Sequence, residues 1–300
     1  MEHDLTGKVA VVVGGGQTPG PGIGNGRAIS LDLARHGATV VAAAQHLDRA
    51  QTTVDAIKEE GGEGWAYELN VIYRDQVAGL FKAVKEKYGR IDIMVYNVGV
   101  NLKHDFATNS ATLEDINHVF DVDLVGCIWS TLECAPIMVE QETGGSIVNI
   151  SSISSKQNGT GIAIGFGIYA LSKAGMNHWS SLSASHYAPL GVRINTLILG
   201  PVTSSYSGPV VQDLLGGTSA AISKATSDAA VPLKGGRKTV WETAHAVTFL
   251  SSDEAKFITG TELAVDGGVR LRVGPDPEMI KIRAQRAVDE LEEAELKKGG

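Results

Sequence analysis

The stretch V9-A-V-V-V13-G14-G-G-Q-T-P-G-P-G-I-G-N-G26 joins a short apolar run to a glycine-rich turn, and R27-A-I-S30 follows it. A run of mostly β-branched apolar residues is typical of a buried parallel strand. Glycines let backbone amides approach a pyrophosphate, and a helix expected over residues 27–36 would add its positive end. Seven glycines in thirteen residues at this position favour a nucleotide-binding turn over an ordinary surface loop.

The same order of strand, turn and helix repeats along the chain. Strands alternating with helices of ordinary length predict one doubly wound parallel sheet of about seven strands, Rossmann-like, with helices on both faces. A nucleotide would bind at the carboxyl ends of the strands, near the point where the strand order reverses. Beyond the first strand and helix, strands are expected at residues 39–44, 64–69, 91–96, 146–150, 192–199 and 262–265, and helices at 47–60, 73–88, 113–142, 167–187 and 239–251.

Composition limits the classes of protein to consider. The chain has 300 residues, 43% of them hydrophobic and 20% charged, as in a globular domain with a full core. A net charge of −8 argues against nucleic acid as a partner, because phosphate binding needs a basic surface. Residues 1–8 lack an apolar signal region and no apolar run approaches ~18 residues, so we expect a cytoplasmic protein without a membrane partner.

Neither cysteines nor histidines predict a metal site. Cys127 and Cys134 are expected as buried thiols on a helix rather than as a disulfide or a metal pair. His46, His118 and His245 show no ligand spacing and are interpreted as structural or surface residues. No metal is therefore predicted.

Tyr169 and Lys173 are the clearest candidate catalytic pair. They stand four residues apart, so on a helix their side chains share a face. A fixed ammonium favours the phenolate, lowers the phenol pKa from about 10, and allows proton exchange with an alcohol near neutral pH. The pair alone is weak evidence. It gains weight because it follows N149-I-S-S152 and a glycine-rich first turn.

With these motifs in order, the chain resembles the short-chain dehydrogenase/reductase superfamily from about residue 5 to residue 271. The family opens with T-G-x-x-x-G-x-G, and here Val13 and Gly14 stand at the T-G position, with Gly24-Asn25-Gly26 as the later glycines. The turn is about six residues longer than usual. Gly22-Ile23-Gly24 is an alternative register, so the phosphate contacts are predicted for the turn as a whole.

Further segments match the family's cofactor site. Y96-N-V-G99 resembles its N-A-G segment, Asn70-Val71 stands beside the expected adenine, and L199-G-P-V-T-S204 resembles the stretch that contacts the carboxamide. F257-I-T-G-T-E-L-A-V-D-G-G268 resembles its closing signature. The resemblance implies cofactor contacts from Gly14, Gly24, Asn25, Gly26, Ala44, Gln45, Asn70, Val71, Asn97, Gly99, Tyr169, Lys173, Gly200, Val202 and Ser204.

The resemblance also implies the catalytic roles. Tyr169 would donate or accept the proton, Lys173 would bind the nicotinamide ribose, and Ser152 would hydrogen-bond the substrate oxygen. Ser151, Ser154 and Ser155 remain competitors, because serine-rich loops after strands are common. Ser152 and Tyr169 are 17 residues apart, more than the usual ~13 of the family, so the loop at residues 156–165 is expected to shape the substrate pocket.

One departure from the family bears on the chemistry. The family often has V-N-L-x-G, whose Asn holds a water in a proton relay, whereas this chain has V122-D-L-V-G126. An ionised Asp123 can accept hydrogen bonds from that water and from Lys173 but cannot donate one. The alternative is that Asp123 merely replaces the Asn as a near-isostere and has no role in the relay.

The predicted function is that of an NAD(P)(H)-dependent oxidoreductase that interconverts a secondary alcohol and a ketone or aldehyde. A 3-oxoacyl-thioester reductase is an alternative within the class, and a non-catalytic nucleotide-binding or scaffold protein is one outside it. NADP is favoured over NAD because Ala44-Gln45-His46 ends the second strand without a carboxylate, and Arg49 or His46 could approach a 2′-phosphate.

Domain organisation and assembly complete the expectations. Residues 1–274 would form the NAD(P)-binding catalytic domain, with residues 203–237 covering a mixed, partly apolar pocket for a small-molecule substrate. Residues 275–300 would form a helical extension with a narrow apolar stripe. The resemblance implies a homo-oligomer, a tetramer or a dimer, to which the extension would add contacts. A solvated terminal helix is the alternative.

Overall fold

A computed structural model describes residues 3–20, 22–100, 111–156, 167–202, 231–234 and 239–271. Ser204, residues 157–166, most of the region 203–237 and the extension 275–300 lie outside these ranges. What the sequence predicts for them stays a prediction.

Strand β1 (Val9–Val13) lies inside a parallel sheet of seven strands, and all five of its residues are buried. The strand order is β3-β2-β1-β4-β5-β6-β7, and every described strand pair is parallel. The order reverses between β1 and β4, which confirms the doubly wound sheet and puts its switch point beside the glycine-rich turn. The other strands are β2 (Thr39–Ala44), β3 (Gly64–Glu68), β4 (Ile93–Tyr96), β5 (Gly145–Ser152), β6 (Val192–Leu199) and β7 (Glu262–Val265).

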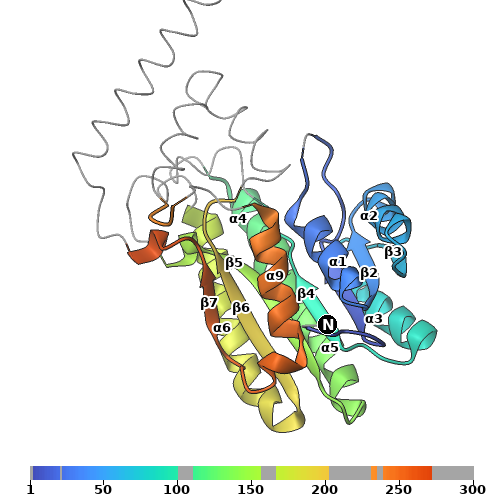
Figure 1. The fold of residues 1–300 in the computed structure, drawn as a ribbon. Coiled ribbons are helices and arrows are strands. Elements are labelled where there is room, and N and C mark those ends of the chain that lie inside the picture. Colours follow the sequence, from blue (N-terminus) through green and yellow to red (C-terminus); the bar gives the residue numbers. More distant parts are fainter. Residues whose placement is uncertain are drawn as a thin grey trace, which may run out of the picture.

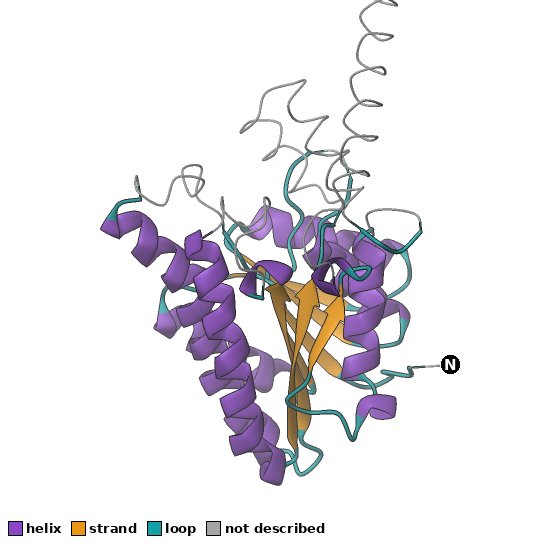
Figure 2. Cartoon of the chain, turned by 90° about the vertical axis from the view of Figure 1, so that its left-hand side faces the viewer, coloured by secondary structure: helices purple, strands orange, loops and turns teal. Residues whose placement is uncertain are grey.

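Helices cover both faces of the sheet, which Figure 2 shows between two helical layers. One layer holds α1 (Asn25–Arg35), α2 (Leu47–Glu59) and α9 (Val240–Ser251). The opposite layer holds α3 (Arg74–Tyr88), α4 (Leu113–Phe120), α5 (Gly126–Glu140) and α6 (Gly167–Tyr187). The first helix α1 and the late helix α9 lie side by side (Figure 1), and the Thr248 hydroxyl donates to the Asp32 carboxylate at 2.6 Å between them.

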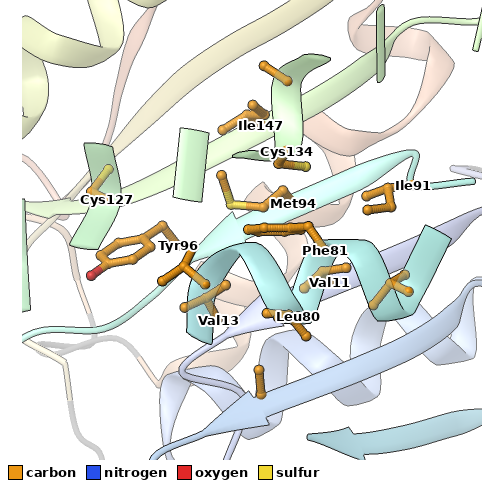
Figure 3. Close-up of a cluster of buried hydrophobic side chains, with 14 of the residues drawn as sticks. Val11, Val13, Leu80, Phe81, Ile91, Met94, Tyr96, Cys127, Cys134 and Ile147 are labelled. Carbon is orange, nitrogen blue, oxygen red and sulfur yellow. The ribbon is translucent and has the colours of Figure 1, made fainter. Parts of the chain in front are cut away.

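The alternation of side chains along β1 divides the core into two clusters. Val9, Val11 and Val13 belong to the cluster beneath α3, α5 and α6, whereas Ala10 and Val12 belong to the one beneath α1 and α9. Figure 3 shows part of the first cluster, with the rings of Phe81 and Tyr96 among the sulfur atoms of Met94, Cys127 and Cys134. Each buried valine contributes about 1.5–3 kcal/mol relative to an exposed one.

Two observed boundaries change how the site is built. Strand β5 ends at Ser152 rather than at residue 150, because its ladder with β6 continues to the Ser152–Leu199 pair. The serines expected in a loop are therefore partly strand residues. The helix expected over residues 113–142 is interrupted by a π-helical turn, Asp121–Val125, between α4 and α5. Short π-helical turns are frequent at functional sites.

The two cysteines are free and buried, as predicted. Burial raises the pKa of the Cys127 thiol to about 12 and raises that of Cys134 as well. The surrounding segment Leu113–Glu140 has the length and hydropathy of a membrane-spanning helix, but half of its most apolar window is buried inside the fold. Such burial is the pattern of a core helix.

Candidate active site

A cavity of about 390 Å³ opens at the carboxyl ends of β1, β2 and β4, where the sequence predicts the nucleotide. None of the described residues that line it is acidic. Ten of the predicted cofactor contacts line it: Gly14, Gly24, Asn25, Gly26, Ala44, Gln45, Asn70, Val71, Asn97 and Gly99.

The glycine turn lines this cavity and is packed so closely that side chains have no space at Gly14 and Gly26. A Cβ on Gly26 would collide with the Gly14 carbonyl oxygen, and Gly14 itself has φ +85°. The Asn97 side chain donates to that same carbonyl at 3.0 Å, which fastens the end of β4 to the turn. Bare backbone is thereby presented to the cavity at the start of α1, as a pyrophosphate site requires.

The extra residues of the long turn are held by Gln17. Its backbone N–H donates to the Arg49 carbonyl at 3.1 Å, and its side-chain oxygen accepts from the Gly24 N–H at 3.1 Å. The turn is thus tied both to α2 and to the start of α1. Arg49, His46 and Thr18 also line the cavity.

Asn25 provides a test of whether a dinucleotide fits this cavity. It stands at the first position of α1 and lines the cavity, and its buried Oδ1 atom has no hydrogen-bond partner among the described residues. Unpaired buried polar atoms are rare and costly in native proteins. The glycine cradle and this acceptor together fit a polar ligand such as NAD(P), which the residues named above would hold.

Lys173 and Tyr169 are not among the described residues that line the cavity; Lys173 is 2% exposed and lies behind Val98, which does line it. Its ammonium donates to the Val98 carbonyl at 3.1 Å and to the Ile150 carbonyl at 3.3 Å, so it joins the ends of β4 and β5. It lies 5.5 Å from the centre of the Tyr169 ring, one turn earlier on α6. The helix therefore brings the two residues to one face, as the sequence predicts, next to the cavity residue Val98.

Asp123 lies under this lysine, on the π-helical turn. Its Oδ2 is 3.5 Å from the Lys173 Nζ and accepts from the Ser172 hydroxyl at 3.3 Å, while Oδ1 accepts from the Val100 N–H at 2.8 Å. Burial raises the pKa of the Asp123 carboxyl, and the Lys173 ammonium opposes that rise. A Cβ on Gly99 would come within 3.2 Å of the Lys173 Nζ, so glycine leaves room for the pair.

The strand geometry distinguishes the serine candidates. Ser151 is buried and faces α6, where its hydroxyl lies 3.5 Å from the Lys173 carbonyl oxygen. Ser152 is half-buried, ends β5 and caps the short 3-10 turn that follows. Its Oγ accepts from the Ser154 N–H at 3.1 Å, and its hydroxyl donates to the Ser154 hydroxyl at 3.2 Å. Both hydrogen bonds of the Ser152 hydroxyl therefore go to Ser154.

Other predicted contacts lie elsewhere. Gly200 and Val202 follow β6 and are not among the residues that line the cavity; the Gly200 N–H donates to Val265 of β7 at 3.0 Å. Sequence reasoning missed the cavity residues Gly16, Thr18, Ile72, Val98 and Val100, and it classed His118, which also lines the cavity, as structural or surface. Their positions directly after strands or within the glycine turn are the signal that could have found them.

Comparisons with known proteins give the family. A family model described as Enoyl-(Acyl carrier protein) reductase matches residues 21–270. The 3-oxoacyl-[acyl-carrier-protein] reductase FabG of Thermotoga maritima is 31% identical over 269 residues, which are 88% of this chain and 98% of that protein. The chain belongs to the short-chain dehydrogenase/reductase superfamily.

Other members of this superfamily are similar over the same range. A 3beta-hydroxysteroid dehydrogenase 1 of Eggerthella lenta is 30% identical over 275 residues, 91% of this chain and 98% of that protein. The crystal structure of a short-chain type dehydrogenase/reductase from Mycobacterium marinum shares 27% identity at a TM-score of 0.77, covering 89% of this chain and 97% of that one. The protein is therefore an oxidoreductase of a superfamily that uses NAD or NADP.

Proposed function

We propose that this short-chain dehydrogenase/reductase interconverts a secondary alcohol and a ketone or aldehyde, with Tyr169 as the proton donor and acceptor. The observation that carries the proposal is the buried Lys173 ammonium, 5.5 Å from the centre of the Tyr169 ring and held by the carbonyls of Val98, just after β4, and of Ile150 in β5. A fixed positive charge beside a phenol favours its ionised form, so Tyr169 can take up or release a proton at moderate pH.

The substrate oxygen would be held by Ser152 and Tyr169 together. The Ser152 hydroxyl accepts from the Ser154 N–H and donates to the Ser154 hydroxyl, so a substrate oxygen would take the place of the Ser154 hydroxyl as the acceptor of its proton. Donation from this hydroxyl polarises a carbonyl, while the Tyr169 phenol completes or removes the proton on the same oxygen. The bound cofactor would supply the hydride that is exchanged with the carbinol carbon.

We favour NADP(H) as that cofactor. Ala44, Gln45, His46 and Arg49 line the cavity at the end of β2, and no acidic residue lines its described part. A carboxylate at this position would bind the ribose hydroxyls of NAD and repel a 2′-phosphate. Arg49 supplies a positive charge for the phosphate instead.

The named relatives suggest two candidate classes of substrate. A 3-oxoacyl-thioester is one, because the FabG relatives of 31% identity are 3-oxoacyl-[acyl-carrier-protein] reductases. A hydroxysteroid is the other, from relatives of 30% identity. A small-molecule alcohol or carbonyl is proposed in either case.

The proposal extends to oligomerisation and location. Leu113, Leu171 and Leu182 are 72%, 63% and 55% exposed on α4 and α6, which suits a homo-oligomer, tetramer or dimer, formed through this helical layer. The protein is proposed to work in the cytoplasm.

One assay tests the proposal against a non-catalytic nucleotide-binding role. The oxidation of NADPH and of NADH is followed by absorbance with a panel of ketones, 3-oxoacyl thioesters and ketosteroids. The reduction of NADP and of NAD is followed in the same way with the corresponding alcohols. Turnover that requires Tyr169 supports the oxidoreductase. Cofactor binding without turnover of any panel member would support the scaffold role.

A further inference from the structure

The end of β5 that carries Ser152 is fastened to the helix that carries Tyr169 by the side chains of Ser155 and Asn177. Ser155 closes the short 3-10 turn η2 (Ile153–Ser155), which begins directly after Ser152. The Asn177 amide donates to the Ser155 hydroxyl at 2.9 Å, and that hydroxyl donates to the Ser152 carbonyl at 2.6 Å. We call these two bonds the Asn177–Ser155 link.

Asn177 belongs to the same stripe of α6 as the catalytic pair. Tyr169, Lys173 and Asn177 follow one another at steps of four, so they lie on one helix face. Asn177 is 4% exposed and faces the end of β5. One helix face thus holds the proton-exchanging phenol, its ammonium and the group that reaches Ser152.

We propose that Asn177 and Ser155 are positioning residues that set the place of the Ser152 hydroxyl relative to the Tyr169 phenol. The inference rests on the proposed function and deepens it, because the bonded atom is the carbonyl of Ser152 itself. With its carbonyl held by Ser155 and its Oγ held by the Ser154 N–H, Ser152 is fixed at both ends. A shift of α6 would then move Ser152 with Tyr169.

The contact made by Asn177 is not optimal for stability. The Oδ1 atom of Asn177 is buried and has no hydrogen-bond partner among the described residues. A buried polar atom left unpaired costs about 1–3 kcal/mol, so apolar side chains of the same shape would stabilise this contact at least as well. The unpaired oxygen does not distinguish the link, however, because the Oδ1 atom of Asn149 is also buried without a partner among the described residues.

The chain contains a matched control. The Asn149 amide donates to the Ser180 hydroxyl at 2.9 Å, and that hydroxyl donates to the Met176 carbonyl at 2.7 Å. This Asn149–Ser180 link also connects β5 with α6 through an asparagine and a serine, with similar burial of the asparagine, and its second bond lies within α6. It does not include Ser152, so its loss affects packing alone.

The experiment compares Ser155→Ala and Asn177→Leu with Ser180→Ala and Asn149→Leu in the full chain. The carbonyl substrate that the panel identifies is used under saturating cofactor. For Ser155→Ala we expect kcat to fall roughly tenfold at unchanged cofactor Kd, since misplacement by about 1 Å can cost up to ~10²-fold. Asn177→Leu should behave alike, and the double variant should be no slower than either single one.

Ser180→Ala should lower the unfolding midpoint as much as Ser155→Ala does but leave kcat near that of the wild type. Ser155→Thr keeps the hydroxyl, so its kcat should stay near that of the wild type. This variant keeps the test valid if Asn177→Leu does not fold. Equal losses of kcat in Ser155→Ala and Ser180→Ala, or no loss in either, would overturn the inference. If Tyr169→Phe stays active, the proposed function fails. If Tyr169→Phe is inactive and Ser155→Ala is fully active, only the positioning role fails.

Discussion

The two halves of the carboxyl edge of the sheet are built differently. Around β1 and β2 the cavity wall is mostly backbone and small side chains, as at Gly14, Gly26 and Ala44. Around β5 and α6, outside the cavity lining, the edge is a buried polar network, as at Lys173 and Asp123. A site made of backbone is damaged by added bulk or altered charge, whereas a side-chain network is damaged by the loss of single atoms.

Removing the phenolic oxygen of Tyr169 should have the largest effect on kcat. Tyr169→Phe is expected to reduce kcat by about 10²–10⁴-fold, because it deletes the group that exchanges the proton. The cofactor half is untouched, so the Kd for NADPH, measured by fluorescence titration, should not change. Retention of more than about a tenth of kcat would remove Tyr169 from the proton transfer.

Altering charge in the cofactor half should affect binding alone. Arg49→Ala is expected to weaken NADPH binding about tenfold and to leave NADH binding unchanged, because only NADPH carries the 2′-phosphate. Calorimetric titration with both nucleotides measures the difference. A wild-type preference for NADH of tenfold or more in kcat/KM would refute the assignment of Arg49.

Replacing the Asp123 carboxylate by an amide changes the charge beneath Lys173 but keeps the shape of the side chain. Asp123→Asn removes a negative charge 3.5 Å from the Lys173 ammonium. The ammonium then favours the Tyr169 phenolate more strongly, and the limb of the pH–kcat profile should move about one unit toward lower pH. The maximum rate should change less than about threefold, since Asn can still accept from the Val100 N–H. Identical profiles for both proteins would show that Asp123 lies outside the relay.

The buried network predicts a small loss of stability in alkali. Burial raises the pKa of Cys127 from 9.0 to about 12, so the fold favours the neutral thiol. This stabilisation is complete below 9.0, the ordinary pKa, and is lost as the pH rises through the folded value of about 12. Across the pH unit centred on 9.0 the loss is about 0.7 kcal/mol. Urea unfolding of the wild type and of Cys127→Ala measures it, and equal slopes against pH would contradict it.

The difference between the halves also explains what the sequence could predict. Glycine spacing and β-branched runs are local signals, so the sheet and the nucleotide-binding turn with Gly14 and Gly26 follow from them, whereas the other cavity contacts follow from the resemblance to the family. The partners of Asp123 come from two distant segments, Val100 and Lys173 with Ser172. No local sequence pattern predicts the π-helical turn on which Asp123 lies. The step of four that identifies Lys173 would also have identified Asn177.

The pairing of α1 with α9 has a consequence for the synthesis of the chain. Ala28, Ile29 and Leu33 of α1 share a cluster with Val240, Ala244 and Val247 of α9, more than two hundred residues later in the sequence. At about 5–20 residues per second, a ribosome completes α1 at least on the order of ten seconds before it makes α9. During that interval the part of α1 that faces α9 has no native cover. A nascent chain arrested before Val240 is therefore expected to remain bound to chaperones, however complete its nucleotide-binding half already is.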